Sequence, residues 1–465
     1  MLLLFCLLSN WSSDTALSEG YTSYSNQHNV VCAANGEVHA IWFKWHQYSD
    51  DYSIWSARYS GNSWTLPQQV SPYSYILVGH PSLATFQGNL YAVWESGREY
   101  SDIVLRRFIG GNWEDTVILI SSGPLRSYAP SLACDMQGVV HIVYEKGYEI
   151  HYMNLVGSVL SSDTVLSNSN VYAAYPCISA FDNNLSVVWS DLRDGNFELY
   201  FKKFNGHEWS DDIRVTNSSN ASIFPALCVD SFGIPNVVWQ EDSDDGFRIF
   251  STTYEQGNFT SPTLLVDSPG DAISPSITSV GTVLHLCWSD SRSGDWEIYS
   301  KTMGGEDLRL TNSPGVSANP SICASDNGNL YLLFWDTRVL PSKVYFKEYL
   351  ASKQSAVKTP STLIVSPNPF TCQTVIELKS SGVKELRLQI YDLAGRLVRN
   401  WELGIGNREL SRIVWDGCDN QGKRLNSGIY FVVFNDIASV VFNDIASVKS
   451  FVGNEKVVKK IILLK

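Results

Sequence analysis

The chain has 465 residues, which is too long for one hydrophobic core, so two domains are expected. Its net charge of -13, from 34 Lys and Arg against 47 Asp and Glu, argues against nucleic acid or an anionic membrane as a partner. No apolar stretch approaches the length that spans a bilayer.

The first segment, Met1–Leu8, is apolar like the central part of a secretory signal. It has neither a positive n-region nor a small-residue cleavage site. We expect residues 1–9 to be the remainder of a signal peptide that starts further upstream. The alternative is an apolar first strand in a cytosolic protein.

A unit of four short strands is repeated seven times from residue 10 to residue 350. Alternating apolar residues, rich in β-branched and aromatic types and separated by turn residues, predict antiparallel strands. A proline opens six copies, roughly every 50 residues, which is a period typical of propellers and solenoids. These prolines are Pro81, Pro130, Pro176, Pro225, Pro275 and Pro320. The second strand of each copy ends in an aromatic residue, expected to be buried between neighbouring sheets: Trp42, Trp94, Tyr144, Trp189, Trp239, Trp288 and Phe334.

The seventh copy lacks a fourth strand, because it stops after Tyr349. The segment Asn10–Ser18 at the front of the chain resembles the fourth strand of other copies. A chain whose beginning supplies the strand that its last repeat lacks predicts a closed ring, a seven-bladed β-propeller. Trp11 is then expected to pair alongside Val344–Tyr349.

A polar turn motif follows the second strand in several copies. An Asp and an Arg two residues apart suggest an acid/base pair, but catalysis needs one asymmetric constellation and this motif is repeated. We therefore expect a structural role, in which Asp accepts backbone N–H groups, Gly supplies positive φ and Arg pairs with a carboxylate. The residues are Asp191, Arg193, Gly195, Asp290, Arg292, Gly294, Asp336 and Arg338.

Candidate ligand-binding residues are those that break the repeat on one rim of the ring. That rim is formed by the connections from the fourth strand to the next blade and from the second strand to the third. Aromatic planes with interspersed polar groups suit a sugar ring or a peptide, although exposed Tyr and Trp equally often pack on the next loop. The candidates are Lys44, Trp45, His46, Tyr48, His80, Arg126, Tyr128, Glu145, Lys146, Tyr172 and Tyr175.

No cofactor is expected. Two acidic loops, Asp50-Asp51 and Asp242–Gly246, carry carboxylates suited to calcium, but solvated turns are the favoured interpretation. The nine cysteines lack CxxC spacing, so neither a zinc site nor a disulfide framework is expected. Buried inert thiols are favoured, and one bridge, Cys32 to Cys323, stays open because ring closure makes their blades neighbours.

The blades, with their Pro-Ser-Ile openings and Trp-x-Asp-x-Arg-x-Gly turns, resemble the sialidase-like propeller repeats of secreted bacterial proteins. Enzymes of that family imply an Arg cluster, a Tyr/Glu nucleophile pair and an Asp acid, with Phe/Tyr-Arg-Ile-Pro in an early strand. The nearest string here, Phe247–Phe250, lacks the proline and falls in a third strand. The resemblance therefore implies the fold, and no catalytic residue is assigned.

After a polar linker at residues 351–362, short strands with Gly, Asp and Asn turns predict a β-sandwich over residues 363–465. From Leu363 to Lys465 this part resembles the Ig-like C-terminal sorting domain of type IX (Por) secretion, which is related to the module of flagellar hook-capping proteins. The resemblance implies export to the outer cell surface or beyond, with the type IX machinery as partner. A plain accessory sandwich is the alternative.

A direct repeat lies within this sandwich, where Val433–Val440 recurs as Val441–Val448. Only one copy can occupy the usual strand, so we expect the other to form a loop.

Three functions remain open from the sequence. The first is an exported propeller that binds a glycan or protein ligand without catalysis. The second is a sialidase-type glycoside hydrolase, although no unrepeated pair of acids is visible. The third is a structural or adhesion spacer. The fold by itself does not choose among them.

Overall fold

The computed structural model describes a defined set of residues: 11–18, 28–32, 36–46, 51–60, 63–72, 77–97, 100–169, 171–340, 342–351, 362–366, 371, 373–379, 385–392, 396–404, 410–436 and 457–463. The chain divides into two compact units, Met1–Gln354 and Ser355–Lys465. Residues 1–9 and most of the linker lie outside the described residues, so the domain boundaries given above stay predictions. No described segment forms a helix long and apolar enough to cross a membrane.

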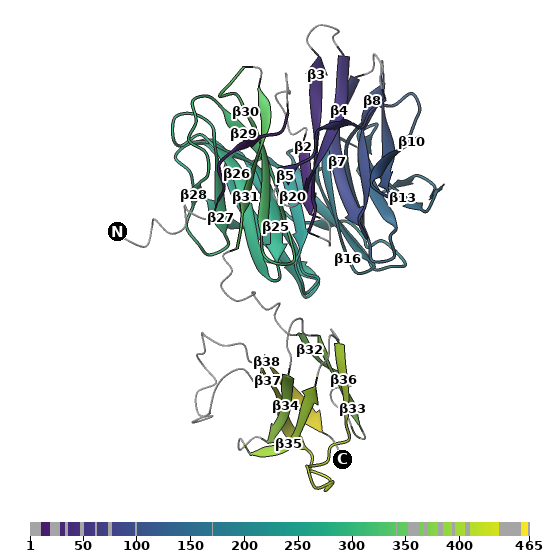
Figure 1. The fold of residues 1–465 in the computed structure, drawn as a ribbon, viewed down its shortest axis with the longest axis vertical. Helices are drawn as coiled ribbons and strands as arrows, with labels where there is room; N and C mark the ends of the chain where they lie inside the picture. The colour runs from purple at the N-terminus through teal and green to yellow at the C-terminus, as the bar shows by residue number, and fades with distance from the viewer. Residues whose placement is uncertain are drawn as a thin grey trace. The chain divides into compact units, whose positions relative to one another are not determined.

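The first unit consists, in its described part, of seven antiparallel sheets of four or five strands (Figure 1). The first three sheets follow one another along the chain. The first contains β2 (His28–Cys32), β3 (Val38–His46), β4 (Asp51–Ser60), β5 (Ser63–Trp64) and β6 (Gln68–Gln69). The second contains β7 (Leu77–Phe86), β8 (Asn89–Gly97), β9 (Ser101–Ile109) and β10 (Asn112–Ser121). The third contains β11 (Ser127–Cys134), β12 (Val140–Lys146), β13 (Glu149–Val156), β14 (Val159–Leu160) and β15 (Thr164–Val165).

The remaining four sheets repeat this order, and the last takes its outer strand from the front of the chain. The fourth contains β16 (Ala173–Phe181), β17 (Asn184–Asp191), β18 (Glu198–Phe204) and β19 (Ile213–Arg214). The fifth contains β20 (Ser222–Val229), β21 (Pro235–Glu241), β22 (Arg248–Glu255), β23 (Asn258–Phe259) and β24 (Thr263–Val266). The sixth contains β25 (Ala272–Val280), β26 (Val283–Asp290), β27 (Glu297–Thr302) and β28 (Leu308–Arg309). The seventh contains β29 (Ser317–Ala324), β30 (Leu330–Asp336), β31 (Lys343–Tyr349) and β1 (Thr15–Ala16).

The sheets close into a ring. The first strand of each sheet packs against the first strand of the next, and β2 packs against both β7 and β29. Strand β1 pairs with β31 through Thr15 opposite Phe346, and Trp11 forms a further bridge with Tyr349. The seven-bladed β-propeller, closed by the leading segment, is therefore confirmed.

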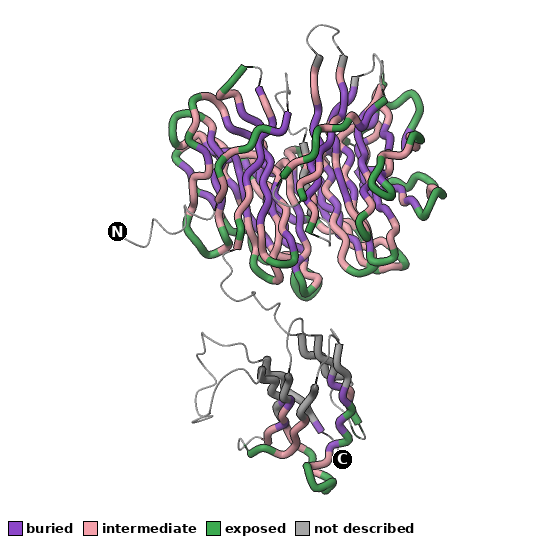
Figure 2. The backbone as a smooth tube through the Cα atoms, viewed as in Figure 1, coloured by how far each residue is buried: buried purple, intermediate pink, exposed green. Residues whose placement is uncertain are grey.

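One hydrophobic core lies between each pair of neighbouring blades, and each holds one of the seven aromatic residues. Trp42 closes the series, because it packs with Leu333 and Phe346 of the last blade and with Leu17 of the leading segment. Burying each large side chain stabilises the fold by roughly 1.5 to 3 kcal/mol. Figure 2 shows the resulting pattern, with buried residues along the strands and exposed ones at the loops.

Two of the cysteines illustrate how burial suppresses thiol chemistry. Burial raises the pKa of the Cys177 thiol to about 11 and that of Cys228 to about 12, so both stay protonated at neutral pH. The side chain of Cys32 lies outside the described residues, so its bridge to Cys323 stays a prediction.

The second unit is a sandwich of two antiparallel sheets. Its inner faces meet in a core that includes Ile376, Leu388, Trp415 and Val432. One sheet contains β32 (Thr362–Ser366), β33 (Thr374–Lys379) and β36 (Leu410–Trp415). The other contains β34 (Glu385–Asp392), β35 (Leu397–Gly404), β37 (Gly428–Asp436) and β38 (Val457–Leu463). The all-β fold of propeller plus Ig-like sandwich is thus confirmed.

The direct repeat falls only partly on this sandwich. Val433–Asp436 of the first copy belong to β37, which pairs with β34 and β38. The second copy lies outside the described residues, so the looped copy stays a prediction.

Candidate functional site

In blades two to seven, a bulge at the start of the first strand places one side chain near the centre of the ring. In blades two to seven the register between the first and second strands shifts at the residue before the proline and at the proline itself. Proline suits a bulge because it has no N–H to donate to the ladder. The residue before it has positive φ in all six blades, and we call these residues the axial ring: His80, Ala129, Tyr175, Phe224, Ser274 and Asn319.

In four members of the axial ring, Ala129, Tyr175, Ser274 and Asn319, the backbone N–H bonds to the preceding blade. The N–H of Ala129 donates to Glu95 Oε1 and that of Tyr175 donates to Glu145 Oε1, both at 2.8 Å. Gln240 and Ser289 accept in the same way, at 2.8 Å, from the ring residues Ser274 and Asn319. The acceptor is always the residue that follows the buried aromatic of the second strand. The contact therefore joins neighbouring blades whatever the acceptor is.

Several of the predicted candidates meet around this ring. His80 Nδ1 lies 2.7 Å from Glu95 Oε1, and the Tyr172 hydroxyl donates to Glu145 Oε2 at 3.3 Å. The ring of Tyr175 lies 4.1 Å, centroid to centroid, from that of Phe224 in the next blade. These residues form one cluster at the axis. We call it the axial cluster, and its members are His80, Glu95, Glu145, Tyr172, Tyr175 and Phe224.

Burial and charge set the protonation of this cluster. Burial raises the pKa of Glu145, against the bonds from Tyr175 and Tyr172, and the nearby charge of Glu95 adds to the rise. Burial alone would lower the pKa of His80, but its contact with Glu95 reverses the direction and the pKa is raised. Glu95 and Glu145 are buried, whereas 40% of the His80 side chain is exposed. A ligand would therefore meet the imidazole and the aromatic rings rather than the carboxylates.

Exposed aromatic and apolar side chains continue this surface outward. Arg126 is exposed, and its guanidinium donates to the Tyr128 hydroxyl at 3.0 Å. The rings of Tyr148 and Tyr172 meet edge to face at 5.5 Å, with Tyr148 71% exposed. Leu125 beside Arg126 is also exposed. Such a surface offers stacking planes with hydrogen-bonding edges.

Other candidates are placed elsewhere. Lys44 lies 4.8 Å above the ring of Trp55, while Trp45 packs on the core between the first two blades. Lys146 pairs with Asp163 at 3.1 Å, in the way that Arg193 pairs with Asp212 in the next blade. The side chain of His46, the whole of Tyr48 and residue Asp50 lie outside the described residues.

The turn motif forms one ion-pair network in three blades. Asp191, Asp290 and Asp336 accept the backbone N–H of the Arg two residues later at 2.7 to 3.0 Å. The same Arg side chains pair with these Asp residues at 2.5 to 2.6 Å. Gly195 and Gly294 have φ of 94° and 102°, which glycine adopts without strain. The contacts are those expected of a structural turn.

Each Arg of the network also reaches a second Asp on the outer strand. Arg193 pairs with Asp212 and Arg292 with Asp307, while Arg338 pairs with Asp14 of the leading segment. A Lys of the third strand joins the same Asp: Lys202, Lys301 and Lys347 in these three blades. In the seventh blade Asp14 therefore pairs with one Arg and one Lys, as Asp212 does in the fourth blade.

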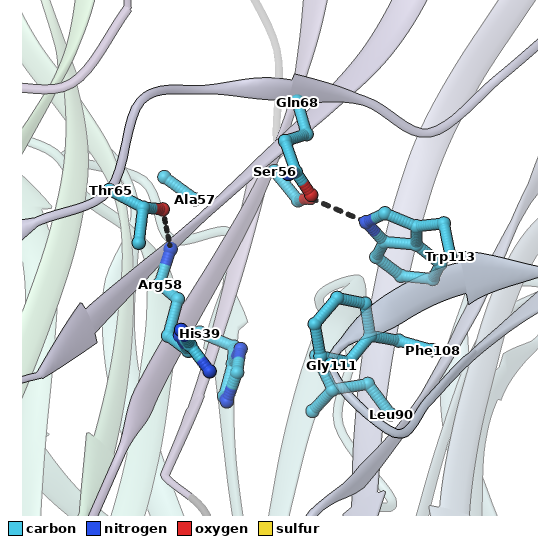
Figure 3. Close-up of a pocket in the computed structure, with 10 residues that line it drawn as sticks. All are labelled: His39, Ser56, Ala57, Arg58, Thr65, Gln68, Leu90, Phe108, Gly111 and Trp113. Carbon is cyan, nitrogen blue, oxygen red and sulfur yellow. Dashed lines mark hydrogen bonds between the residues drawn. The ribbon is translucent and has the colours of Figure 1, made fainter.

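A small cavity lies between the first two blades, outside the axial ring (Figure 3). Its volume is about 60 Å³, too small for a sugar, and it is lined by His39, Ser56, Arg58, Phe108 and Trp113 among others. The Trp113 indole donates to Ser56 Oγ at 3.0 Å. His39 is 3% exposed, and among the described residues its Nε2 has no hydrogen-bond partner. Burial lowers the pKa of His39 to about 4, although Glu37 acts in the opposite direction.

His39 should make the protein less stable in mild acid. In the unfolded chain His39 binds a proton below its ordinary pKa of about 6.5, whereas in the folded protein it stays neutral down to about pH 4. The free energy of unfolding therefore falls as the pH falls from about 6.5 to about 4. Between pH 7.5 and pH 5 the wild type should lose roughly 2 kcal/mol more of its free energy of unfolding than His39→Asn does. Urea unfolding at both pH values measures this.

His207→Asn, at an exposed histidine, is the matched control for that experiment. A wild-type and a His39→Asn curve that run parallel from pH 7.5 to pH 5 would contradict the assignment.

In the described part of the chain, no three His, Cys, Asp or Glu side chains are grouped so that they could hold a metal ion. The acidic loop Asp242–Gly246 closes as a turn, with the N–H of Gly246 donating to the Ser243 carbonyl at 3.1 Å. Calcium binding there stays untested.

Comparison with known proteins supports the two-part architecture. Residues 369–436 match the FlgD Ig-like domain family. No curated protein is similar enough in sequence to count as a relative. An ulvan lyase of polysaccharide lyase family PL25 matches in structure with a TM-score of 0.51 and 11% identity, covering 71% of this chain and 94% of that chain. The likeness shows the propeller fold alone.

A second solved structure is PorZ, a surface component of the type IX secretion system of Porphyromonas gingivalis. It matches with a TM-score of 0.40 and 16% identity, covering 93% of this chain and 59% of that chain. A similarity of this size carries no argument about function.

Sequence reasoning found part of the axial cluster. It singled out His80, Glu145, Tyr172 and Tyr175, but it missed Glu95, Phe224 and the polar ring residues. A signal was present, because the residue before each repeated proline differs from blade to blade. Only the bulge shows that these positions face the same axis.

Proposed function

We propose that this protein is exported by the type IX route and that its propeller binds a glycan or protein ligand, without catalysis, at the end of the ring that carries the axial cluster. The observation that carries the binding proposal is the convergence of His80 of blade two, Tyr172 and Tyr175 of blade four and Phe224 of blade five. Export rests on the match of the C-terminal sandwich to the FlgD Ig-like family and on its resemblance to sorting domains. The expected location is the outer cell surface or the medium.

The two acids at the axis do not favour a hydrolase. Glu95 and Glu145 each accept the N–H of the next blade at 2.8 Å, as the neutral side chain of Gln240 does elsewhere in the ring. Because the same backbone contact also forms with the neutral Gln240, its role is to join neighbouring blades, and it gives no reason to assign catalysis to Glu95 or Glu145. Fluorogenic glycosides test this directly, since turnover would replace the binding proposal by a glycosidase.

Deleting residues 355–465 should keep the propeller inside the cell envelope. The chain is expressed behind a functional signal peptide in a bacterium with a type IX system, and surface protein is measured by protease shaving and immunoblotting. We expect the full chain at the surface and the truncated chain in the periplasm. The same host with its type IX translocon disabled is the control, and surface display of the truncated chain would refute the sorting role.

A further inference from the structure

The axial ring carries varied side chains at a backbone conformation that favours glycine. The φ angles of His80, Tyr175 and Phe224 are 42°, 56° and 52°, and the other members lie between 45° and 56°. A residue other than glycine adopts this left-handed region only at a cost in backbone free energy. Glycine would form the same bulge without this cost, because the bulge depends on the backbone alone. Side chains that are retained at these positions therefore point to a role beyond the fold.

The ring has an aromatic arc and a polar arc. Tyr175 and Phe224, in blades four and five, have rings 4.1 Å apart and inclined by 35°. In blades six and seven the Ser274 hydroxyl donates to Asn319 Oδ1 at 3.2 Å. His80 of blade two adds an exposed imidazole whose Nδ1 is held by Glu95. All of these side chains are partly exposed, so they are accessible at the axis.

From this arrangement we propose that the axial ring binds the uncharged terminal sugar of a glycan. The C–H face of the sugar lies on the outer face of the stacked Tyr175–Phe224 pair, and its hydroxyls bond to Ser274, Asn319 and His80. The inference rests on the proposed binding function and names its ligand class. Aromatic faces opposed by neutral hydrogen-bonding groups match the two faces of a pyranose ring.

Charge at the ring selects against an acidic sugar. Among the described residues that touch the ring, two carboxylates, Glu95 and Glu145, lie beside one imidazole, and both contact ring members, while the guanidinium of Arg126 lies further out and bonds to Tyr128. A sugar carboxylate or sulfate would be placed near these buried charges, where repulsion is less screened than in water. The groups that touch the ligand directly are neutral, or in the case of His80 already paired.

The closed ring also favours the end of a chain over its middle. Ring side chains come from blades two to seven, around the same axis. A glycan lying across the ring would touch the blades on two sides only. A terminal residue entering along the axis meets the aromatic and polar arcs together.

The test uses glycine to separate folding from binding. Tyr175→Gly and Phe224→Gly each remove a stacking plane while relieving an unfavourable φ, so melting temperatures should stay close to the wild type. Gln256→Gly is the matched control, because Gln256 has φ of 52° in an exposed hairpin turn away from the ring. Ser274→Gly removes a member of the polar arc in the same way.

Binding of the full chain is measured on an array of neutral oligosaccharides with different terminal sugars, their sialylated and uronate-capped counterparts, and a peptide array. We expect neutral termini to bind at least tenfold better than acidic ones. Tyr175→Gly and Phe224→Gly should each weaken that binding about two- to twelvefold, since an aromatic contact is worth about 0.5–1.5 kcal/mol. Gln256→Gly should leave it unchanged.

Other outcomes overturn the proposal in distinguishable ways. Glycan binding that survives both aromatic-arc variants, or that prefers acidic termini, removes the axial assignment and leaves the binding function intact. Peptide binding lost in Tyr175→Gly makes the ring a protein site. Silence of the wild type on both arrays rejects the proposed function itself.

Discussion

Removing Trp11–Ser18 is expected to destabilise the propeller by on the order of 5 kcal/mol and to lower its melting temperature by roughly 10 °C or more. The segment closes the ring through backbone bonds of 2.8 and 2.9 Å, from the Ser12 N–H to the Glu348 carbonyl and from the Leu17 N–H to the Val344 carbonyl. Leu17 is buried in the core between the last and first blades. Without the segment that core and the edge of β31 meet water.

The effect should exceed that of any loss within one blade, because closure joins segments more than 300 residues apart. Differential scanning calorimetry of the full chain and of the deletion measures it. Asp14→Ala and Asp307→Ala make a matched pair, since each removes an Asp that holds one Arg and one Lys. Only Asp14 belongs to the closing segment, so Asp14→Ala should also speed proteolysis at the front of the chain. A deletion that melts within 2 °C of the wild type, taking 2 °C as about 1 kcal/mol, would refute closure by this segment.

Asp290→Ala is expected to cost about 3 to 5 kcal/mol, the typical result of leaving one partner of a buried ion pair behind. The Asp290 carboxylate has no exposed surface and accepts four bonds. The donors are the Trp288 indole and the Ser268 hydroxyl, each at 2.8 Å, with the Arg292 backbone N–H at 2.9 Å and its guanidinium at 2.6 Å. Burial alone would raise the pKa of Asp290, but these donors hold it below its usual value. The substitution leaves all four donors without their acceptor.

A double substitution tests whether the unpaired charge of Arg292 causes the loss of stability. Asp290→Ala with Arg292→Met removes both charges and should be less destabilised than Asp290→Ala alone. Asp191→Ala should behave like Asp290→Ala, because the Trp189 indole, the Ser169 hydroxyl and Arg193 repeat the same contacts. Urea unfolding gives the free energies. If Asp290→Ala unfolds like the wild type, the motif has no structural role.

The repeated parts of the fold could be predicted because each copy faces the same physical demand. Trp189, Trp239 and Trp288 all had to be buried between sheets, and Asp and Arg in the turns had to satisfy the same N–H groups and charges. Even closure was foreseeable, since Trp11 and Asp14 stand in the pattern of an outer strand. Asp14 pairs with Arg338 and Lys347 as that pattern requires.

The site was harder to predict, because it is made from positions where copies differ. Lys146 broke the repeat and was a candidate, yet it pairs with Asp163 in place of an Arg. Phe224 precedes a repeated proline, and only a comparison with the other blades marks its position as variable. Its role at the axis depends on a bulge whose partner strand follows later in the chain.

The all-β class, the blade period, the closing strand and the sandwich at the end of the chain could be predicted from the amino-acid order, because alternating patterns and turn residues act locally and repeat. Which unrepeated side chains meet depends on the assembled fold. Ring closure brings the first strands of all seven blades around one axis, and in six of them a bulge residue with positive φ lies there, among them His80, Tyr175 and Phe224. Those contacts depend on distances between blades, which no local pattern encodes.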